Sequence, residues 1–263
     1  MALSLSQKEI IIDVIKNCLR NKFRNYSPES KSMPFHFRLL GKDRMALYSF
    51  IQSLNTTFGT SIFEPVAKEI GKLNFIESET QYSLGKEIKN TAQEKIQDIM
   101  NILSTGGDPN KDNEIEQIKT ACKKGEFNSI GTVRADLFLR DKNDKIFLFD
   151  LKTAKPNISN FKDFKRTLLE WAAILISQNP QVDVNTLIAI PYNPYEPEPY
   201  QRWTLKGMLD LEKELKVGEE FWNFLGGENT YTDLLDCFEK AGMELRTEID
   251  EYFNNFENRE GKK

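Results

Sequence analysis

The hydrophobic positions along the chain change their period near residue 126, from a helical to a strand-like spacing. Before that point, apolar residues recur every three or four positions over 6–24, 43–57 and 86–104. This spacing predicts three amphipathic helices. Shorter patterns predict further helices over about 61–71 and 112–124. The first half of the chain is therefore expected to be almost entirely helical.

Polar residues mark the expected starts of these helices. Ser6 and Glu9 fit the S-x-x-E capping box, which predicts the start of the first helix. Asp43 is placed to open the second helix. The short helix is expected to follow Ser61, with Pro65 tolerated in its first turn.

The middle of the chain has the sequence pattern of β-strands. The runs "IGTVRADLFLR" (130–140) and "KIFLFDL" (145–151) are strand-like and are separated by the polar turn "DKND", which predicts a β-hairpin. An amphipathic helix over 158–178 and a strand over 185–192 follow. The order strand, strand, helix, strand predicts an α/β (α+β) fold, in which a mixed central sheet is flanked by helices.

We expect a single domain over 1–263 with three parts. Residues 1–125 form a helical N-terminal part, and 126–192 form the core of hairpin, helix and strand. Residues 193–263 hold the rest of a loop rich in proline and tyrosine, "PYNPYEPEPYQRWT" (191–204), and a helical C-terminal part. The prolines favour an extended loop.

The charge is uneven along the chain. The net charge is −4, which argues against a non-specific nucleic-acid binder. Residues 1–50 carry nine Lys/Arg against four Asp/Glu, and 151–166 carry five against one, whereas 207–260 carry five against fifteen. This distribution fits a protein that binds a polyanion in one cleft.

No apolar run approaches the roughly 18 residues of a membrane span, and the first 23 residues do not have the pattern of a secretory signal. The protein is expected to be cytoplasmic.

The residue types limit the possible chemistry. The chain has one histidine, His36, and three widely separated cysteines, so it has too few ligands for a zinc site based on His and Cys. His36 lies between aromatic residues and is expected to be structural or incidental. Catalysis would therefore depend on carboxylates, lysines and a hard metal ion.

The hairpin places such residues together. Alternation puts Asp150 and Lys152 on one face of a strand, and Asp136 is available on the partner strand. Two close carboxylates repel unless a cation neutralises them, and Mg²⁺ prefers such oxygen ligands. The carbonyl of Leu151 could add a ligand, and Lys152 could orient the attacking water or stabilise the charge of the transition state. This set of residues suits phosphodiester hydrolysis.

The segments "RAD" and "FDLK" resemble the PD-(D/E)xK nuclease superfamily, although Ala135 stands where the motif has proline. The resemblance implies a restriction-endonuclease-like core and assigns catalysis to Asp136, Asp150 and Lys152. It also implies a further acid from an earlier helix. Glu64 is the preferred candidate, and Glu69 remains the alternative.

The second half of the chain, through "PYNPYEPEPYQRWT" and "EEFWNFLGGENTYTDLLDCFEKAG", resembles the type II restriction endonucleases of the TdeIII/MjaII group. This resemblance implies Mg²⁺-dependent cleavage of double-stranded DNA at a short specific site of the GGNCC class. A palindromic site is matched most economically by a symmetric homodimer.

Several residues are candidates for DNA contacts. Some could line a phosphate-binding groove or, equally, form a solvated helix face: Lys155, Lys162, Lys165 and Arg166. On the loop, Gln201 and Arg202 have the chemistry to read base edges, with Tyr200 beside them. The alternative is that the loop tyrosines only pack the loop onto the core.

Two other functions remain open. One is a PD-(D/E)xK nuclease of repair or RNA processing, without strict sequence choice. The other is a non-catalytic helical interaction protein, in which the hairpin carries only a salt bridge and the acidic C-terminal helices bind a partner.

Overall fold

The computed structural model describes residues 3–26, 34–152, 161–200 and 207–259. The chain folds into two compact units. The first combines residues 1–66 with 228–263, and the second comprises residues 67–227. The expected divisions near residues 125 and 192 do not coincide with the limits of these units. In the described part of the chain, no helix combines the length and apolar character needed to cross a membrane.

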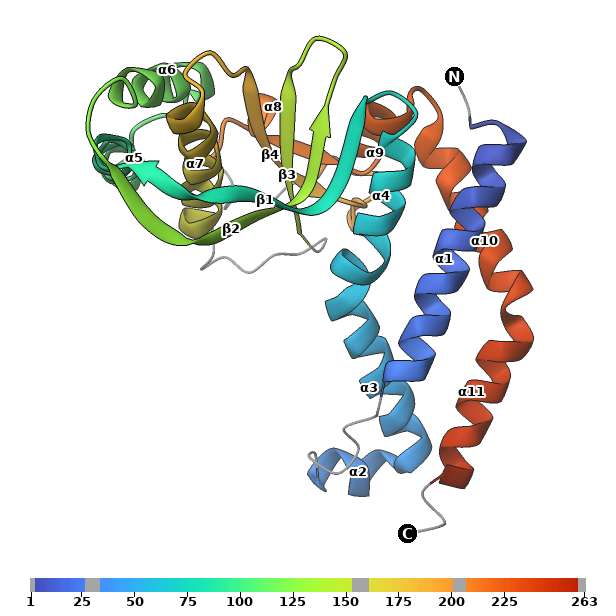
Figure 1. The fold of residues 1–263 in the computed structure, drawn as a ribbon. Coiled ribbons are helices and arrows are strands. Elements are labelled where there is room, and N and C mark those ends of the chain that lie inside the picture. Colours follow the sequence, from blue (N-terminus) through green and yellow to red (C-terminus); the bar gives the residue numbers. More distant parts are fainter. Residues whose placement is uncertain (1–2, 27–33, 153–160, 201–206, 260–263) are drawn as a thin grey trace. The chain divides into compact units, whose positions relative to one another are not determined.

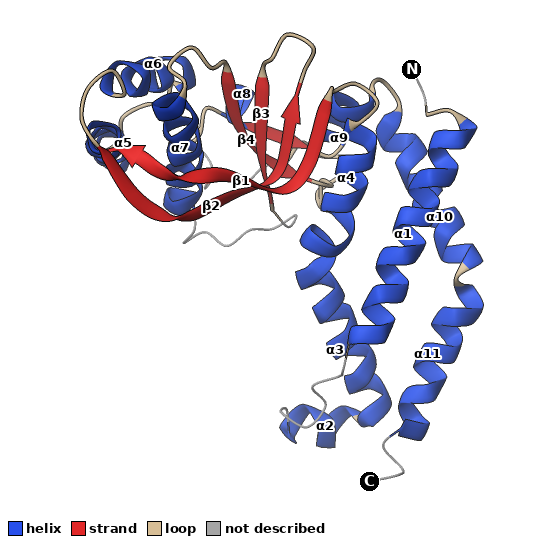
Figure 2. Ribbon diagram, viewed as in Figure 1, coloured by secondary structure: helices blue, strands red, loops and turns tan. Residues whose placement is uncertain are grey.

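The first unit is helical (Figure 2). Its elements are α1 (Leu5–Asn25), α2 (Pro34–Leu40), α3 (Lys42–Phe58), the π-helical turn η1 (Gly59–Phe63), the start of α4 (Glu64–Gly71), α10 (Thr230–Glu244) and α11 (Arg246–Arg259). Aromatic rings from α1, α3 and α11 pack together, with Phe23 stacked on Tyr252 at a centroid distance of 4.3 Å and Phe50 edge-on to Phe253 at 5.2 Å.

Two local predictions in this unit are wrong in detail. The first helix is capped by Ser4 and Gln7, which form the reciprocal capping box one half-turn before the predicted Ser6 and Glu9. Ser61 does not open a helix, because it lies within η1 and the helical path continues from α3 into α4.

Part of the uneven charge of the chain is neutralised by ion pairs within this unit. Basic residues of α1 pair with acidic residues of α10 and α11, and the pairs are Lys8–Asp233, Lys16–Glu244 and Arg20–Glu248. Asp233 also accepts a hydrogen bond from the backbone of Leu3, at 2.7 Å. The acidic C-terminal helices therefore already have a basic partner inside the chain.

The second unit contains the five-stranded sheet (Figures 1 and 2). Its strands are β1 (Glu77–Lys89), β2 (Phe127–Arg140), β3 (Ile146–Leu151), β4 (Val184–Ile190) and β5 (Leu215–Val217), and they lie in this order across the sheet. The pairs β1–β2 and β2–β3 are antiparallel, whereas β3–β4 and β4–β5 are parallel. The predicted mixed sheet is confirmed.

The hairpin and the strand that follows it match the prediction, but two strands were not predicted. β1 occupies residues without a predicted element and the start of a predicted helix, because only three of its thirteen residues are buried and they give little alternation. Gly85, with a φ of +138°, lies at a shift in the β1–β2 register. β5 has only three residues, which is too short to produce a pattern.

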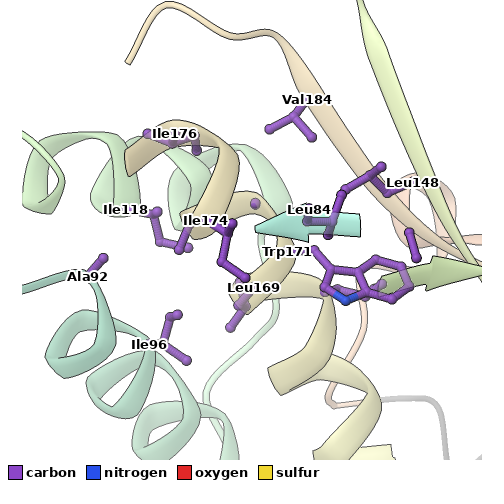
Figure 3. Packing of buried hydrophobic residues seen from close by; sticks show 14 of the residues in the cluster. Leu84, Ala92, Ile96, Ile118, Leu148, Leu169, Trp171, Ile174, Ile176 and Val184 are labelled. Carbon is purple, nitrogen blue, oxygen red and sulfur yellow. The ribbon is translucent and has the colours of Figure 1, made fainter. Parts of the chain in front are cut away.

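Helices cover the two faces of the sheet. They are the remainder of α4, α5 (Asn90–Ser104), α6 (Lys111–Ala121), α7 (Phe161–Gln178), α8 (Leu211–Glu214) and α9 (Glu219–Gly226). On one face, Trp171 and Ile174 of α7 join a buried cluster with Ile96 of α5, Ile118 of α6 and Leu148 of β3 (Figure 3). On the other face, the ring of Phe149 meets the aromatic rings of α9, with Phe221 at a centroid distance of 5.3 Å.

A cluster of four charged side chains is buried within this unit. Lys165 of α7 binds Glu114 of α6 at 2.5 Å and Glu214 of α8 at 2.6 Å. Lys111 binds Glu214 at 3.1 Å and Thr186 of β4. Burial alone would raise the pKa of Glu214, but the ammonium groups of Lys111 and Lys165 hold it below its usual value. The cluster carries no net charge, which makes its burial tolerable.

We expect Glu214→Ala to destabilise the protein by about 3–5 kcal/mol, because it removes the carboxylate partner of the buried Lys111 and leaves the buried Lys165 with Glu114 alone. Glu212, which is exposed on the same helix, provides the matched control, and Glu212→Ala should change the free energy of unfolding by less than about 0.5 kcal/mol. Urea denaturation at neutral pH measures both values. Equal stabilities of the two variants would contradict the proposed role of the cluster.

Candidate active site

The site lies where the β2–β3 ladder ends. The last backbone pair joins Leu137 to Phe149, so the same register brings Asp136 opposite Asp150. There the side chain of Asp136 continues the pairing, because its Oδ2 accepts a hydrogen bond from the backbone N–H of Leu151 at 2.9 Å. The predicted meeting of the two acidic residues at one edge of the hairpin is therefore seen in the structure.

The alternation along β3 decides which way the charged side chains point. Leu148 belongs to the core beneath α7, whereas Phe149 packs on α9 across the sheet. Asp150 and Lys152 share the face of Leu148. Accordingly, the Nζ of Lys152 lies 2.6 Å from Oδ1 of Asp150 and 4.7 Å from the ring centroid of Phe164 on α7.

The backbone beside these side chains is held by the parallel partner strand. The N–H of Lys152 donates a hydrogen bond to the carbonyl of Ala189, at 2.9 Å, directly after the last residue of β3. Lys152 is thus fixed at its backbone by β4, at its ammonium by Asp150 and along its side by Phe164. A lysine held at three points is suited to orient a reacting group.

Asp150 has an unusual electrostatic environment. Its side chain is almost completely buried, with 4% of the residue exposed. The pKa of Asp150 is raised to about 6, chiefly by burial and also by the nearby charge of Asp136, against the opposing effect of Lys152. Two acidic groups with only one lysine leave an excess of negative charge, so the site favours an additional cation.

The residues present fit a hard divalent ion. Among the residues that the structure describes, no group of three or more His, Cys, Asp or Glu side chains could hold a metal. Mg²⁺ does not need such a cage, because it keeps several waters and is usually bound by one or two carboxylates. Asp136 and Asp150 can supply these two carboxylates. The carbonyl of Leu151 remains a predicted third ligand.

The two candidate helix acids differ in their surroundings. Glu64 is the first residue of α4 and only 2% of it is exposed. Glu69 lies further along α4 and pairs with Lys72 on the helix surface, at 2.6 Å. Glu69 thus has the surroundings of an ordinary surface ion pair. Glu64 stays the predicted helix acid.

The candidate DNA-binding residues have different locations. Lys165 is fully buried in the ion cluster, so its interpretation as a phosphate contact is wrong for this structure. Lys162 is exposed on α7, and Arg166 binds Gln97 of α5 at 2.7 Å. Tyr200 is partly buried against the core. Three candidates lie outside the described residues: Lys155, Gln201 and Arg202.

The structure also brings two residues to the site that the sequence did not single out. Phe164 lies on the predicted amphipathic helix, and its ring also lies under Lys152. Gln81 of β1 places its Nε2 3.4 Å from Oδ1 of Asp136. Neither is marked by local sequence, because both contacts depend on pairing between distant segments.

A mixed sheet flanked by helices, with two acidic residues and a lysine at the open end of its central hairpin, defines a restriction-endonuclease-like fold. Comparison with known families is more specific. Residues 3–242 match the family described as "Type II restriction endonuclease, HinfI". The chain belongs to this family of type II restriction endonucleases, which are site-specific DNA nucleases.

Individual relatives support the same assignment. The chain is 28% identical to the type II restriction enzyme MjaII of Methanocaldococcus jannaschii, in an alignment that covers 95% of this chain and 74% of that enzyme. It is 27% identical to the type II restriction enzyme HgiEI of Herpetosiphon aurantiacus, over 85% of this chain and 82% of the relative. The predicted resemblance to restriction endonucleases is confirmed.

Asp150 should make the stability of the metal-free protein depend on pH. Its folded pKa is raised above the usual 3.8, so its favourable contribution is complete below about pH 4 and is lost as the pH rises through about 6. We expect Asp150→Asn to stabilise the protein at pH 8 by up to about 3 kcal/mol, and to lose this advantage near pH 4.

Chemical denaturation in EDTA at the two pH values measures this effect. Asp98→Asn is the control, because Asp98 lies on the surface of α5 beside Lys95. A stability difference for Asp150→Asn that does not change between pH 4 and pH 8 would contradict the raised pKa.

Proposed function

We propose that this protein is a Mg²⁺-dependent type II restriction endonuclease that hydrolyses phosphodiester bonds of double-stranded DNA at a short, specific site. The observation that carries the proposal is the contact between Lys152 and the buried Asp150, beside Asp136, at the end of the hairpin. Family membership supports the reaction class. The metal requirement is inferred from the excess negative charge of the site.

In this proposal each side chain has a distinct role. Asp136 and Asp150 would hold the ion, which lowers the pKa of bound water and neutralises charge on the phosphate. Lys152 donates its N–H groups to the attacking water or to the phosphate oxygen that gains charge. Asp150 and Phe164 keep the ammonium of Lys152 in position for this task. Glu64 is proposed as a further acid of the site.

Sequence recognition and phosphate binding are assigned to other residues. Lys155, Lys162 and Arg166 are proposed to contact the DNA backbone, and Gln201 and Arg202, with Tyr200, to contact base edges. A recognition site of the GGNCC class is proposed from the resemblance to the TdeIII/MjaII group. A DNA substrate also implies a cytoplasmic location for the enzyme.

We further propose that the enzyme acts as a homodimer, because a symmetric dimer matches a palindromic site. The first unit offers an apolar surface on α2 and α3 that is consistent with association. Six large hydrophobic residues are exposed on these two helices: Phe35, Leu39, Leu40, Leu47, Tyr48 and Ile51. Exposed apolar side chains are enriched at protein interaction surfaces.

The central test is cleavage of a plasmid of known sequence in the presence of Mg²⁺. We expect the wild type to yield discrete fragments whose sequenced ends share one motif, and chelation with EDTA to abolish cleavage. Asp136→Ala, Asp150→Ala and Lys152→Ala should each lower the single-turnover rate by about 10³-fold or more, because they remove metal binding or charge stabilisation.

Lys145→Ala is the matched control for Lys152→Ala, because Lys145 directly precedes the same strand and pairs with Asp183 on the surface. It should cut at the wild-type rate.

Binding of duplex by Asp150→Ala, measured without cleavage, should show two chains per duplex. An intact plasmid with every protein would refute the proposal, and a smear without shared ends would favour a non-specific nuclease.

Glu64 and Glu69 can be separated in the same assay. We expect Glu64→Gln to lower the single-turnover rate by about 10²-fold, since a buried carboxylate of the site would be lost, and Glu69→Gln to leave the rate unchanged. Both proteins should be checked for unchanged thermal unfolding. The reverse order of effects would assign the helix acid to Glu69.

A further inference from the structure

Gln81 of β1 has an unusual backbone conformation and lies beside the candidate metal ligand Asp136. Its φ is +52°, in the left-handed region that side-chain-bearing residues rarely adopt, although it lies inside a strand. The β1–β2 register is the same on both sides, since Thr80 pairs with Leu137 and Tyr82 with Ala135. No residue is inserted here, so an ordinary bulge does not account for the conformation.

The register places Gln81 directly opposite Asp136. Its amide Nε2 lies 3.4 Å from Oδ1 of Asp136, at the long end of hydrogen-bonding distance. The other carboxylate oxygen, Oδ2, accepts the N–H of Leu151. The two oxygens of Asp136 are therefore approached by two donors, one from each neighbouring strand.

We propose that Gln81 is a positioning residue that holds Asp136 in the orientation required for metal binding. This inference rests on the proposed metal-dependent reaction. Outer-shell partners of metal-binding carboxylates fix the geometry of the ligand, and their loss typically costs 10–100-fold in metal affinity or activity. Backbone strain that persists at an exposed strand position is expected where the residue serves a site.

The positive φ of Gln81 allows a positioning role to be distinguished from a role in stabilising the fold. A residue retained only for the fold would be improved by glycine, which adopts positive φ without strain. We therefore expect Gln81→Gly to keep or raise the thermal unfolding temperature while weakening metal binding. Gln81→Ala should weaken metal binding equally, and Gln81→Asn, which keeps the amide on a shorter side chain, should retain part of the affinity.

Asp144 supplies the matched control, because it also has a positive φ, of 61°, but lies in the turn between β2 and β3. Asp144→Gly removes the same kind of strain at the other end of the hairpin. We expect it to keep or raise the unfolding temperature and to leave metal binding unchanged.

The experiment uses the full chain with two measurements. Calorimetric titration with Ca²⁺, a hard cation that takes the same oxygen ligands, should show an affinity about tenfold lower for Gln81→Ala and Gln81→Gly than for the wild type. In single-turnover cleavage at rising Mg²⁺, the half-saturating Mg²⁺ concentration should increase about tenfold, with DNA affinity unchanged.

The outcomes separate this inference from the proposed function. If the wild type cleaves DNA and both Gln81 variants match it in Ca²⁺ affinity and Mg²⁺ dependence, the positioning role is overturned while the enzyme activity stands. If only DNA affinity falls, Gln81 contacts the substrate and does not position Asp136. A wild type that neither binds Ca²⁺ nor cleaves DNA would overturn both.

Discussion

The second unit is organised around the burial of the Asp150 carboxylate. A carboxylate that is 4% exposed is unfavourable in itself, as its raised pKa shows, and it requires compensation from its neighbours. The compensation comes from Lys152, whose backbone is fixed by β4 and whose ammonium lies over a ring of α7. Asp136, which β2 brings opposite, adds negative charge and makes the site favour a cation.

The same unit buries charge in two different ways. In the cluster of Lys111, Lys165, Glu114 and Glu214, two positive and two negative groups satisfy one another, so it needs no further ion and stabilises a single arrangement. At the end of the hairpin, two carboxylates meet one lysine. The negative charge that remains there is typical of a cation-binding site, whereas a balanced cluster of charges is typical of a protein core.

The sequence predicted those features that depend on local pattern. The hairpin, the covering helix and β4 followed from periodicity, and the meeting of Asp136 with Asp150 followed from alternation. What could not be predicted depends on contacts between distant segments. β1 has a weak pattern because few of its positions are buried, so the sequence did not point to Gln81. The burial of Lys165 was missed because its partners come from α6 and α8.

Counts of charged residues along the sequence do not show which charges are free to bind DNA, because some of them pair with each other in the folded protein. The basic excess of the N-terminal region suggested a surface for a polyanion, yet Lys8, Lys16 and Arg20 pair with α10 and α11. Lys165 is likewise neutralised inside the core. The proposed positive charge for DNA lies closer to the hairpin, where Lys162 is exposed on the helix that also supports Lys152. An acidic protein can bind DNA through such a site because the local field, and not the net charge, attracts the phosphates.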